Sequence, residues 1–168
     1  MFPGSMSTTH DQVIELIPRL RRYARALMRG DVQAADDLVQ DCLERALSRL
    51  SLWRRQSDLR AWLFTIMHNL YVNRVRYSAL RARTEEAGEF SASEGIGPSS
   101  FLDMERAMNA LSGDQREIIL MVTLEGMSYQ QVATILGVPE GTVMSRLSRA
   151  RRLLHERLAL RMPEGYPS

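Results

Sequence analysis

The stretch GVPEGTVMSRLSRARRLL, residues 137–154, decides the fold because it places a glycine turn directly before an arginine-rich helix. Four arginines fall between Gly141 and Leu154, with no acidic residue among them. Gly137 tolerates the positive φ angle that a tight turn requires. Pro139 suits the first position of a helix, where its missing N–H costs nothing. The pattern therefore predicts a turn followed by a long, positively charged helix over 139–160.

A shorter helix is predicted just before this turn, over residues 128–136. Ser128-Tyr129-Gln130-Gln131 fits a capping box. In that motif the serine hydroxyl accepts a bond from a backbone N–H, and the glutamine reaches back to the cap. A short helix, a glycine turn and a long helix together predict a helix-turn-helix.

The arginines of the long helix lie opposite its apolar face. On a wheel of 3.6 residues per turn, Val143, Leu147 and Ala150 share the face expected to pack inward. Outward arginines can pair with guanine edges or phosphates in the major groove of DNA. A solvated arginine face is the alternative, and the helix-turn-helix pattern favours DNA. The residues predicted to face DNA are Thr142, Met144, Ser145, Arg146, Ser148, Arg149 and Arg152.

Composition limits the possible classes of protein. The 168 residues, 45% of them hydrophobic, suffice for one ordinary domain or two small ones. Cys42 is the only cysteine, so no disulfide can form within the chain, which suits a reducing cytoplasm. No run of ~18 apolar residues occurs, so no membrane insertion is expected. Residues 1–5, before Met6, resemble a cloning remnant and are left out of the fold prediction.

Helical periodicity extends through the rest of the chain. Residues 11–29, 32–50 and 58–82 predict three amphipathic helices that form one small bundle. In the third, the apolar positions expected to face inward run from Leu59 to Val75. Further helices are predicted over 103–111 and 114–124.

Residues 84–100 separate the two helical parts. This stretch, TEEAGEFSASEGIGPSS, holds four glutamates, four serines, three glycines and a proline, which is the composition of a flexible acidic linker. The fold is therefore predicted to be all-α, with two small helical domains at 10–82 and 102–162 joined by a linker at 83–101.

Three stretches resemble the extracytoplasmic-function (ECF) sigma factors of bacteria. Residues 114–154 resemble region 4 of that family. AADDLVQDCLERAL, residues 34–47, resembles region 2.2, and LRAWLFTIMHNLYVNRVR, residues 59–76, resembles regions 2.3 and 2.4. The resemblance covers roughly residues 12 to 160, in the family's order and with the tether in the right place.

The resemblance implies a dissociable specificity subunit of RNA polymerase. It implies that region 2 docks on the β′ subunit and captures the melted −10 element, while region 4 holds the β subunit and contacts the −35 element. It also implies a cytoplasmic protein controlled by an anti-sigma factor, without a catalytic residue, cofactor or metal. The β′ contact is predicted at an acidic stripe on one helix face, made of Asp37, Gln40, Asp41 and Glu44.

The −10 contact is predicted on the third helix, where amides and arginines could bind an unstacked base. The residues are Asn69, Asn73, Arg74 and Arg76. Tyr71 and Tyr77 lie between them and could stack on bases or simply pack. The loop that holds a flipped base is expected either around 52–58 or in the turn after the third helix.

Two other classes of function remain as alternatives. A helix-turn-helix regulator that binds operators without polymerase would need a dimerisation helix or a sensor domain, and neither is evident. An enzyme is disfavoured because His10, His68 and His155 are scattered and no HExxH, P-loop or glycine-rich phosphate motif occurs.

Overall fold

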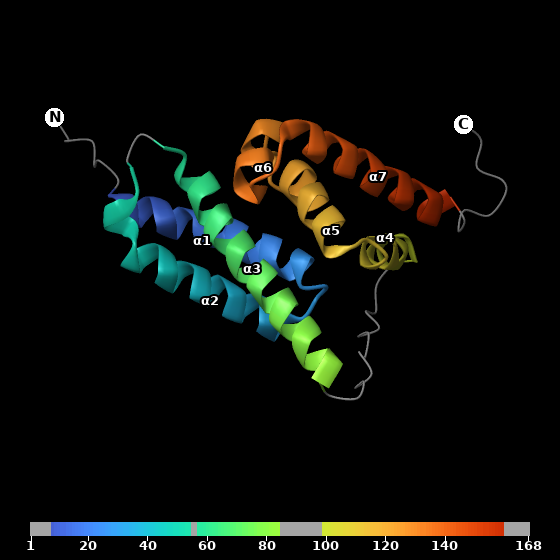
Figure 1. The fold of residues 1–168 in the computed structure, drawn as a ribbon, viewed down its shortest axis with the longest axis horizontal. Coiled ribbons are helices and arrows are strands. Elements are labelled where there is room, and N and C mark those ends of the chain that lie inside the picture. Colours follow the sequence, from blue (N-terminus) through green and yellow to red (C-terminus); the bar gives the residue numbers. More distant parts are fainter. Residues whose placement is uncertain (1–7, 55–56, 85–98, 160–168) are drawn as a thin grey trace. The chain divides into compact units, whose positions relative to one another are not determined.

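The structure is a computed structural model that describes residues 8–54, 57–84 and 99–159. In these ranges the regular elements are all helices (Figure 1). The chain divides into two compact units, residues 1–81 and 82–168. The all-α fold predicted from the sequence is confirmed. The predicted cloning remnant at 1–5 lies outside the described residues, as does most of the predicted linker.

The first unit contains three long helices: α1 (Thr9–Leu27), α2 (Val32–Ser48) and α3 (Leu59–Thr84). A 3-10 turn, Leu50–Leu52, follows α2. Thr8 caps α1 with a capping box in which Asp11 is the reciprocal partner. Asp31 caps α2 by accepting a bond from the backbone N–H of Ala34. Local side chains thus set where both helices begin.

Side chains from all three helices form the core of this unit. Leu20 and Tyr23 of α1, Leu38 of α2 and Leu63 and Phe64 of α3 are almost completely buried. The rings of Tyr23 and Phe64 meet edge to face, with centroids 4.9 Å apart and an interplanar angle of 68°. Burial of each such side chain contributes about 1.5–3 kcal/mol, so these contacts hold the N-terminal half of α3 against α1 and α2.

The C-terminal part of α3 extends beyond this core. Leu70 is the last buried residue of the helix, and every residue from Val75 to Thr84 is exposed. Val75 was expected to face inward, and 48% of it is exposed. The prediction was wrong there because the helix continues past the neighbouring helices that could cover it. The helix also reaches Thr84, two residues into the predicted linker.

The second unit contains α4 (Ser99–Asn109), α5 (Gly113–Ile119), a π-helical turn (Leu120–Leu124), α6 (Tyr129–Leu136) and α7 (Glu140–Ala159). The helix predicted over 114–124 is therefore α-helical only in its first part. The Thr123 hydroxyl donates to the carbonyl of Ile119 at 2.6 Å. Such a bond competes with the backbone for that carbonyl, which favours a wider turn at this place.

The predicted helix-turn-helix is formed by α6 and α7. Ser128 and Gln131 make the reciprocal capping box, with bonds of 3.1 and 3.0 Å. Gly137 ends α6 in the left-handed conformation, at φ 65° and ψ 36°. Pro139 precedes α7 by one residue and caps it with its carbonyl, which accepts from Thr142. Pro139 was predicted to be the first residue of this helix, and it lies one residue before the helix begins.

A buried arginine ties α4 to α5 in this unit. The Arg116 guanidinium donates to the carbonyl of Met108 at 2.6 Å and to the side chain of Asn109 at 3.1 Å. Both acceptors lie at the end of α4, where helix carbonyls lack partners within the helix. These two bonds satisfy part of the hydrogen-bonding capacity of a guanidinium that would otherwise be costly to bury.

Candidate functional site

The apolar face of α7 packs as the wheel predicts. Val143, Leu147 and Ala150 are buried. The residues predicted to face DNA lie outside this core: Met144, Ser145, Ser148, Arg149 and Arg152 are exposed, and Thr142 and Arg146 are half-buried. Local geometry thus presents one polar helix face with an exposed methionine, 52% of which is accessible.

The arginines of α7 differ in whether they have an acidic partner. Arg146 Nη1 lies 3.6 Å from Asp114 Oδ2 of α5. Arg152 Nε lies 3.8 Å from Glu156 Oε1, one turn along the same helix. Arg149 and Arg151 are exposed and form no ion pair with the described part of the chain. Arg151 was not among the predicted DNA-facing residues; the run Arg149-Ala150-Arg151-Arg152 is the signal that could have included it.

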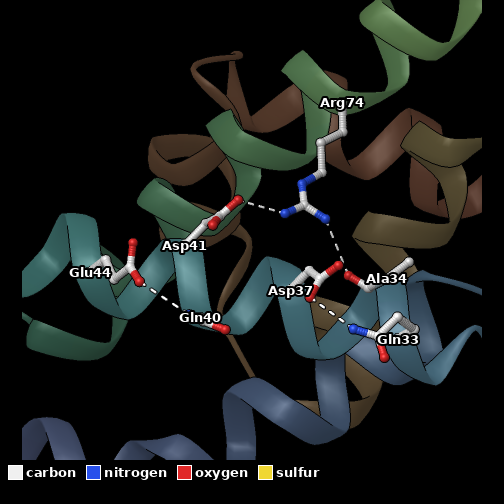
Figure 2. A network of polar contacts seen from close by, with 7 residues as sticks. All are labelled: Gln33, Ala34, Asp37, Gln40, Asp41, Glu44 and Arg74. Carbon is white, nitrogen blue, oxygen red and sulfur yellow. Dashed lines mark hydrogen bonds and ion pairs between the residues drawn. The ribbon is translucent and has the colours of Figure 1, made fainter.

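The acidic stripe of α2 is exposed. Figure 2 shows the hydrogen bonds within it. Gln33 Nε2 donates to Asp37 Oδ1 at 3.1 Å, and Gln40 Nε2 donates to Glu44 Oε1 at 3.2 Å. These four residues follow one line along the helix because they are three or four residues apart. Gln33 extends the predicted stripe by one turn and was missed by the sequence prediction.

Asp41 differs from the rest of the predicted stripe because it bonds to α3. Its Oδ2 lies 2.6 Å from Arg74 Nη2. The other terminal nitrogen of Arg74, Nη1, donates to the backbone carbonyl of Ala34 at 3.2 Å (Figure 2). A residue predicted to bind polymerase and a residue predicted to bind DNA are thus joined directly.

The other residues predicted to contact the −10 element are exposed on α3. Asn69, Asn73 and Arg76 are open to solvent and make no side-chain bond to the described residues. Tyr77 is 64% exposed, whereas Tyr71 is half-buried. The helix carries five arginines and no aspartate or glutamate. It therefore presents a positive surface suited to phosphates.

The two loops considered for a flipped base are only partly described. Residues 52–54 and 57–58 lie in the described ranges, whereas residues 55–56 and the turn after α3 do not. Trp53 Nε1 is buried without a hydrogen-bond partner in the described residues. The place of a flipped base in one of these two loops stays a prediction.

The described ranges show neither a metal cluster nor a membrane span. No group of three or more His, Cys, Asp or Glu side chains within residues 8–54, 57–84 and 99–159 could hold a metal ion. No helix in these ranges is both long and apolar enough to cross a membrane. The Cys42 thiol donates to the carbonyl of Leu63, and burial raises its pKa to about 12, so it stays protonated.

Comparison with known protein families identifies the class of both units. Residues 13–68 match the family described as the sigma2 domain of PhyR. Residues 101–154 match sigma-70 region 4. The two helical units are therefore the region 2 and region 4 folds of a sigma factor, a class of transcription regulators rather than of enzymes.

Similar proteins define the family within this class. The chain is 37% identical over 150 residues to the ECF RNA polymerase sigma factor EcfG of Rhodopseudomonas palustris, covering 86% of this chain and 81% of that protein. It is 31% identical to the ECF sigma factor SigC of Mycobacterium tuberculosis, over 74% of this chain and 70% of that one. The chain belongs to the ECF RNA polymerase sigma factors, which confirms the resemblance seen in the sequence.

A solved structure supports the same assignment. The sigma factor RpoE of Bartonella quintana, crystallised with the anti-sigma factor NepR, is 35% identical to this chain. The match has a TM-score of 0.79 and covers 91% of this chain and 98% of that one.

Proposed function

We propose that this chain binds core RNA polymerase and directs it to promoters, with region 2 at the −10 element and region 4 at the −35 element. The observation that carries the proposal is the exposed, arginine-bearing face of α7, which follows a glycine turn. A helix in this setting fits the major groove, where arginine pairs with guanine or phosphate. Residues 10–82 and 102–162 would form the two DNA-binding domains, with 83–101 as the tether.

The β′ contact is proposed on the exposed stripe of α2. Asp37, Gln40 and Glu44 offer carboxylate and amide groups in one line, extended by Gln33. Their intrahelical bonds hold the side chains against the helix, which reduces the entropy lost when a partner binds. Complementary charge on a basic partner would orient the encounter.

The −10 contact is proposed on α3, with Asn69, Asn73 and Arg76 as the exposed polar groups. The −35 contact is proposed on α7, with Arg149 as an exposed arginine outside the ion pairs and Met144 as an apolar contact, such as to a thymine methyl. The β subunit would hold the second unit near its site. Acting with polymerase places the protein in the cytoplasm.

An anti-sigma factor is proposed as the regulator. The support is the similarity to RpoE of Bartonella quintana, which was crystallised with the anti-sigma factor NepR. Isothermal titration calorimetry of this chain with the NepR of Bartonella quintana tests this proposal directly. Binding would support this mode of control, whereas no heat exchange at micromolar concentrations would mean that this chain does not accept that NepR.

The first test of the proposed function is co-elution with sigma-free core RNA polymerase in size-exclusion chromatography. The wild-type chain is expected to co-elute, and the double variant Asp37→Ala/Gln40→Ala is expected to elute alone. The matched control is Asp36→Ala, because Asp36 is an exposed carboxylate on the same helix that borders the stripe without being one of its residues, and it lies 3.9 Å from Arg25. This control should co-elute as the wild type does.

Either failure has a definite meaning. A wild-type chain that does not co-elute at micromolar concentrations contradicts the polymerase proposal and favours a regulator that binds operators without polymerase. Equal loss for the control and the double variant would show that the loss is not specific to the stripe, whereas co-elution of the double variant would show that the stripe is not the contact.

A further inference from the structure

We propose that Arg74 is a positioning residue, which holds the −10-binding helix α3 against the polymerase-binding helix α2, rather than a residue that contacts DNA. This inference rests on the proposed function and refines it. It separates Arg74 from the exposed residues Asn69, Asn73 and Arg76 on the same helix.

The guanidinium of Arg74 is bonded to α2 at two points. Nη2 lies 2.6 Å from Asp41 Oδ2, and Nη1 donates to the carbonyl of Ala34 at 3.2 Å (Figure 2). Ala34 and Asp41 are seven residues apart, yet one planar group reaches both. A helix carbonyl points toward the C-terminus and an aspartate side chain leans toward the N-terminus, so the two acceptors approach each other along the helix. Arginine suits this place because its donors form a rigid fork.

Arg74 lies where α3 leaves the core. Leu70, one turn earlier, is the last buried residue of α3, and Arg74 is the last half-buried residue of the helix. Its side chain is 31% exposed. Residues four apart lie on the same helix face, so Arg74 continues the face that packs on α2. Beyond it the helix runs for ten residues without a buried side chain.

The position of this contact determines the direction of the free part of α3. The upstream contacts, Tyr23 with Phe64 and Cys42 with Leu63, hold the helix some ten residues before Arg74. At 1.5 Å per residue that is roughly 15 Å. Two points that far apart define the axis of a helix, so the Arg74 contacts would determine where Asn73 and Arg76 are presented.

A role in DNA contact fits Arg74 less well than its neighbour Arg76. To reach a phosphate, the Arg74 guanidinium would first have to give up a carboxylate at 2.6 Å and a carbonyl. Arg76 is exposed and has no bonding partner among the described residues. The two arginines are two residues apart and so lie on different sides of the helix. They therefore form a matched pair for a test.

The test compares Arg74→Ala with Arg76→Ala in two measurements. The first is amide hydrogen exchange of residues 71–76 in the free full-length chain. Arg74→Ala is expected to raise these rates about fivefold, the factor that corresponds to ~1 kcal/mol, and Arg76→Ala to leave them within twofold. Asp41→Ala should reproduce the faster exchange, because it removes the carboxylate that accepts from Arg74.

The second measurement is the salt dependence of holoenzyme binding to promoter DNA with a melted −10 element. Loss of one phosphate contact lowers the magnitude of the slope by about 1. Arg76→Ala is expected to lower it by that amount, whereas Arg74→Ala weakens binding with the slope unchanged. The variant Arg74→Gln keeps a polar side chain but removes the charge and the guanidinium fork, and it replaces Arg74→Ala if the latter does not fold.

Two outcomes would overturn the inference. A slope that falls for the Arg74 variants as it does for Arg76→Ala would assign Arg74 to DNA, whatever the exchange rates show. Unchanged exchange in Arg74→Ala would show that the bonds to α2 do not hold the helix. Failure of the wild-type holoenzyme to bind promoter DNA would instead refute the proposed function, and the exchange measurement would still decide whether Arg74 holds α3.

Discussion

Arg146 of α7, a residue of the proposed −35 surface, lies beside Asp114 at the N-terminus of α5, with 3.6 Å between Nη1 and Oδ2. This ion pair places an acidic group next to the proposed DNA surface. Asp114 sits in the first turn of α5, where the helix dipole also favours a negative charge. The carboxylate therefore competes with DNA for the Arg146 guanidinium.

Replacing Asp114 should strengthen DNA binding with little effect on stability. In Asp114→Asn, Arg146 would no longer be held by a carboxylate, and holoenzyme affinity for a −35-containing promoter should rise by up to several-fold. The free energy of unfolding should fall by less than about 1 kcal/mol, because exposed ion pairs contribute little. Filter binding and urea denaturation measure the two effects. Weaker DNA binding by this variant would contradict competition between the two partners.

Removing Arg149 should weaken promoter binding more than removing an arginine farther along α7. If Arg149 contacts a base, Arg149→Ala should cost about 1–3 kcal/mol in holoenzyme affinity, with the loss concentrated on one −35 position. An equal loss on every −35 sequence would assign it to a phosphate. Arg157→Ala is the control, because Arg157 is exposed in the last turn of the same helix. Equal effects of the two variants would argue against a −35 contact at Arg149.

Two glycines near the start of α7 should respond oppositely to alanine. Gly137 has φ +65°, so Gly137→Ala should lower the free energy of unfolding by about 1–2 kcal/mol even though no atom blocks a Cβ. Gly141 is helical with open space around it, so Gly141→Ala should raise stability by about 0.5–1 kcal/mol. Chemical denaturation of the full chain measures both. A stabilising Gly137→Ala would show that the turn is not held in the left-handed conformation.

Cys42 should make stability depend on pH in the alkaline range. Burial raises its pKa from an ordinary 9.0 to about 12, so above pH 9 the unfolded chain loses a proton that the folded chain keeps. Stability should therefore fall as pH rises from 9 toward 12, by up to about 1.4 kcal/mol per pH unit.

The control for this effect is Cys42→Ala, which removes the thiol and should flatten the dependence between pH 8 and 10.5. Urea titrations of both proteins across this range give the comparison. The native thiol should also resist alkylation at pH 8 and react after unfolding. Rapid labelling of the native protein, or identical pH profiles, would mean that the thiol is accessible.

Much of the fold follows from interactions between residues that are close in sequence. The Ser128–Gln131 capping box, the turn at Gly137 and the apolar face of α7 each depend on positions a few residues apart. Such features can be predicted because helix caps and 3.6-residue periodicity are local. Helix ends were less predictable: α3 continues to Thr84, and the helix expected over 114–124 ends in a π turn.

The sequence by itself thus determined the all-α class, the helix-turn-helix, the exposed side of α7 and the family. Only the tertiary structure decided which charged residues already form ion pairs within the chain. Asp41 and Arg74 were predicted for two different partners, yet they bond to each other across 33 residues of sequence. Arg146 is paired, whereas Arg149, on the same helix face, is not. The physical reason is that an ion pair depends on where separate helices bring their side chains, which no local periodicity encodes.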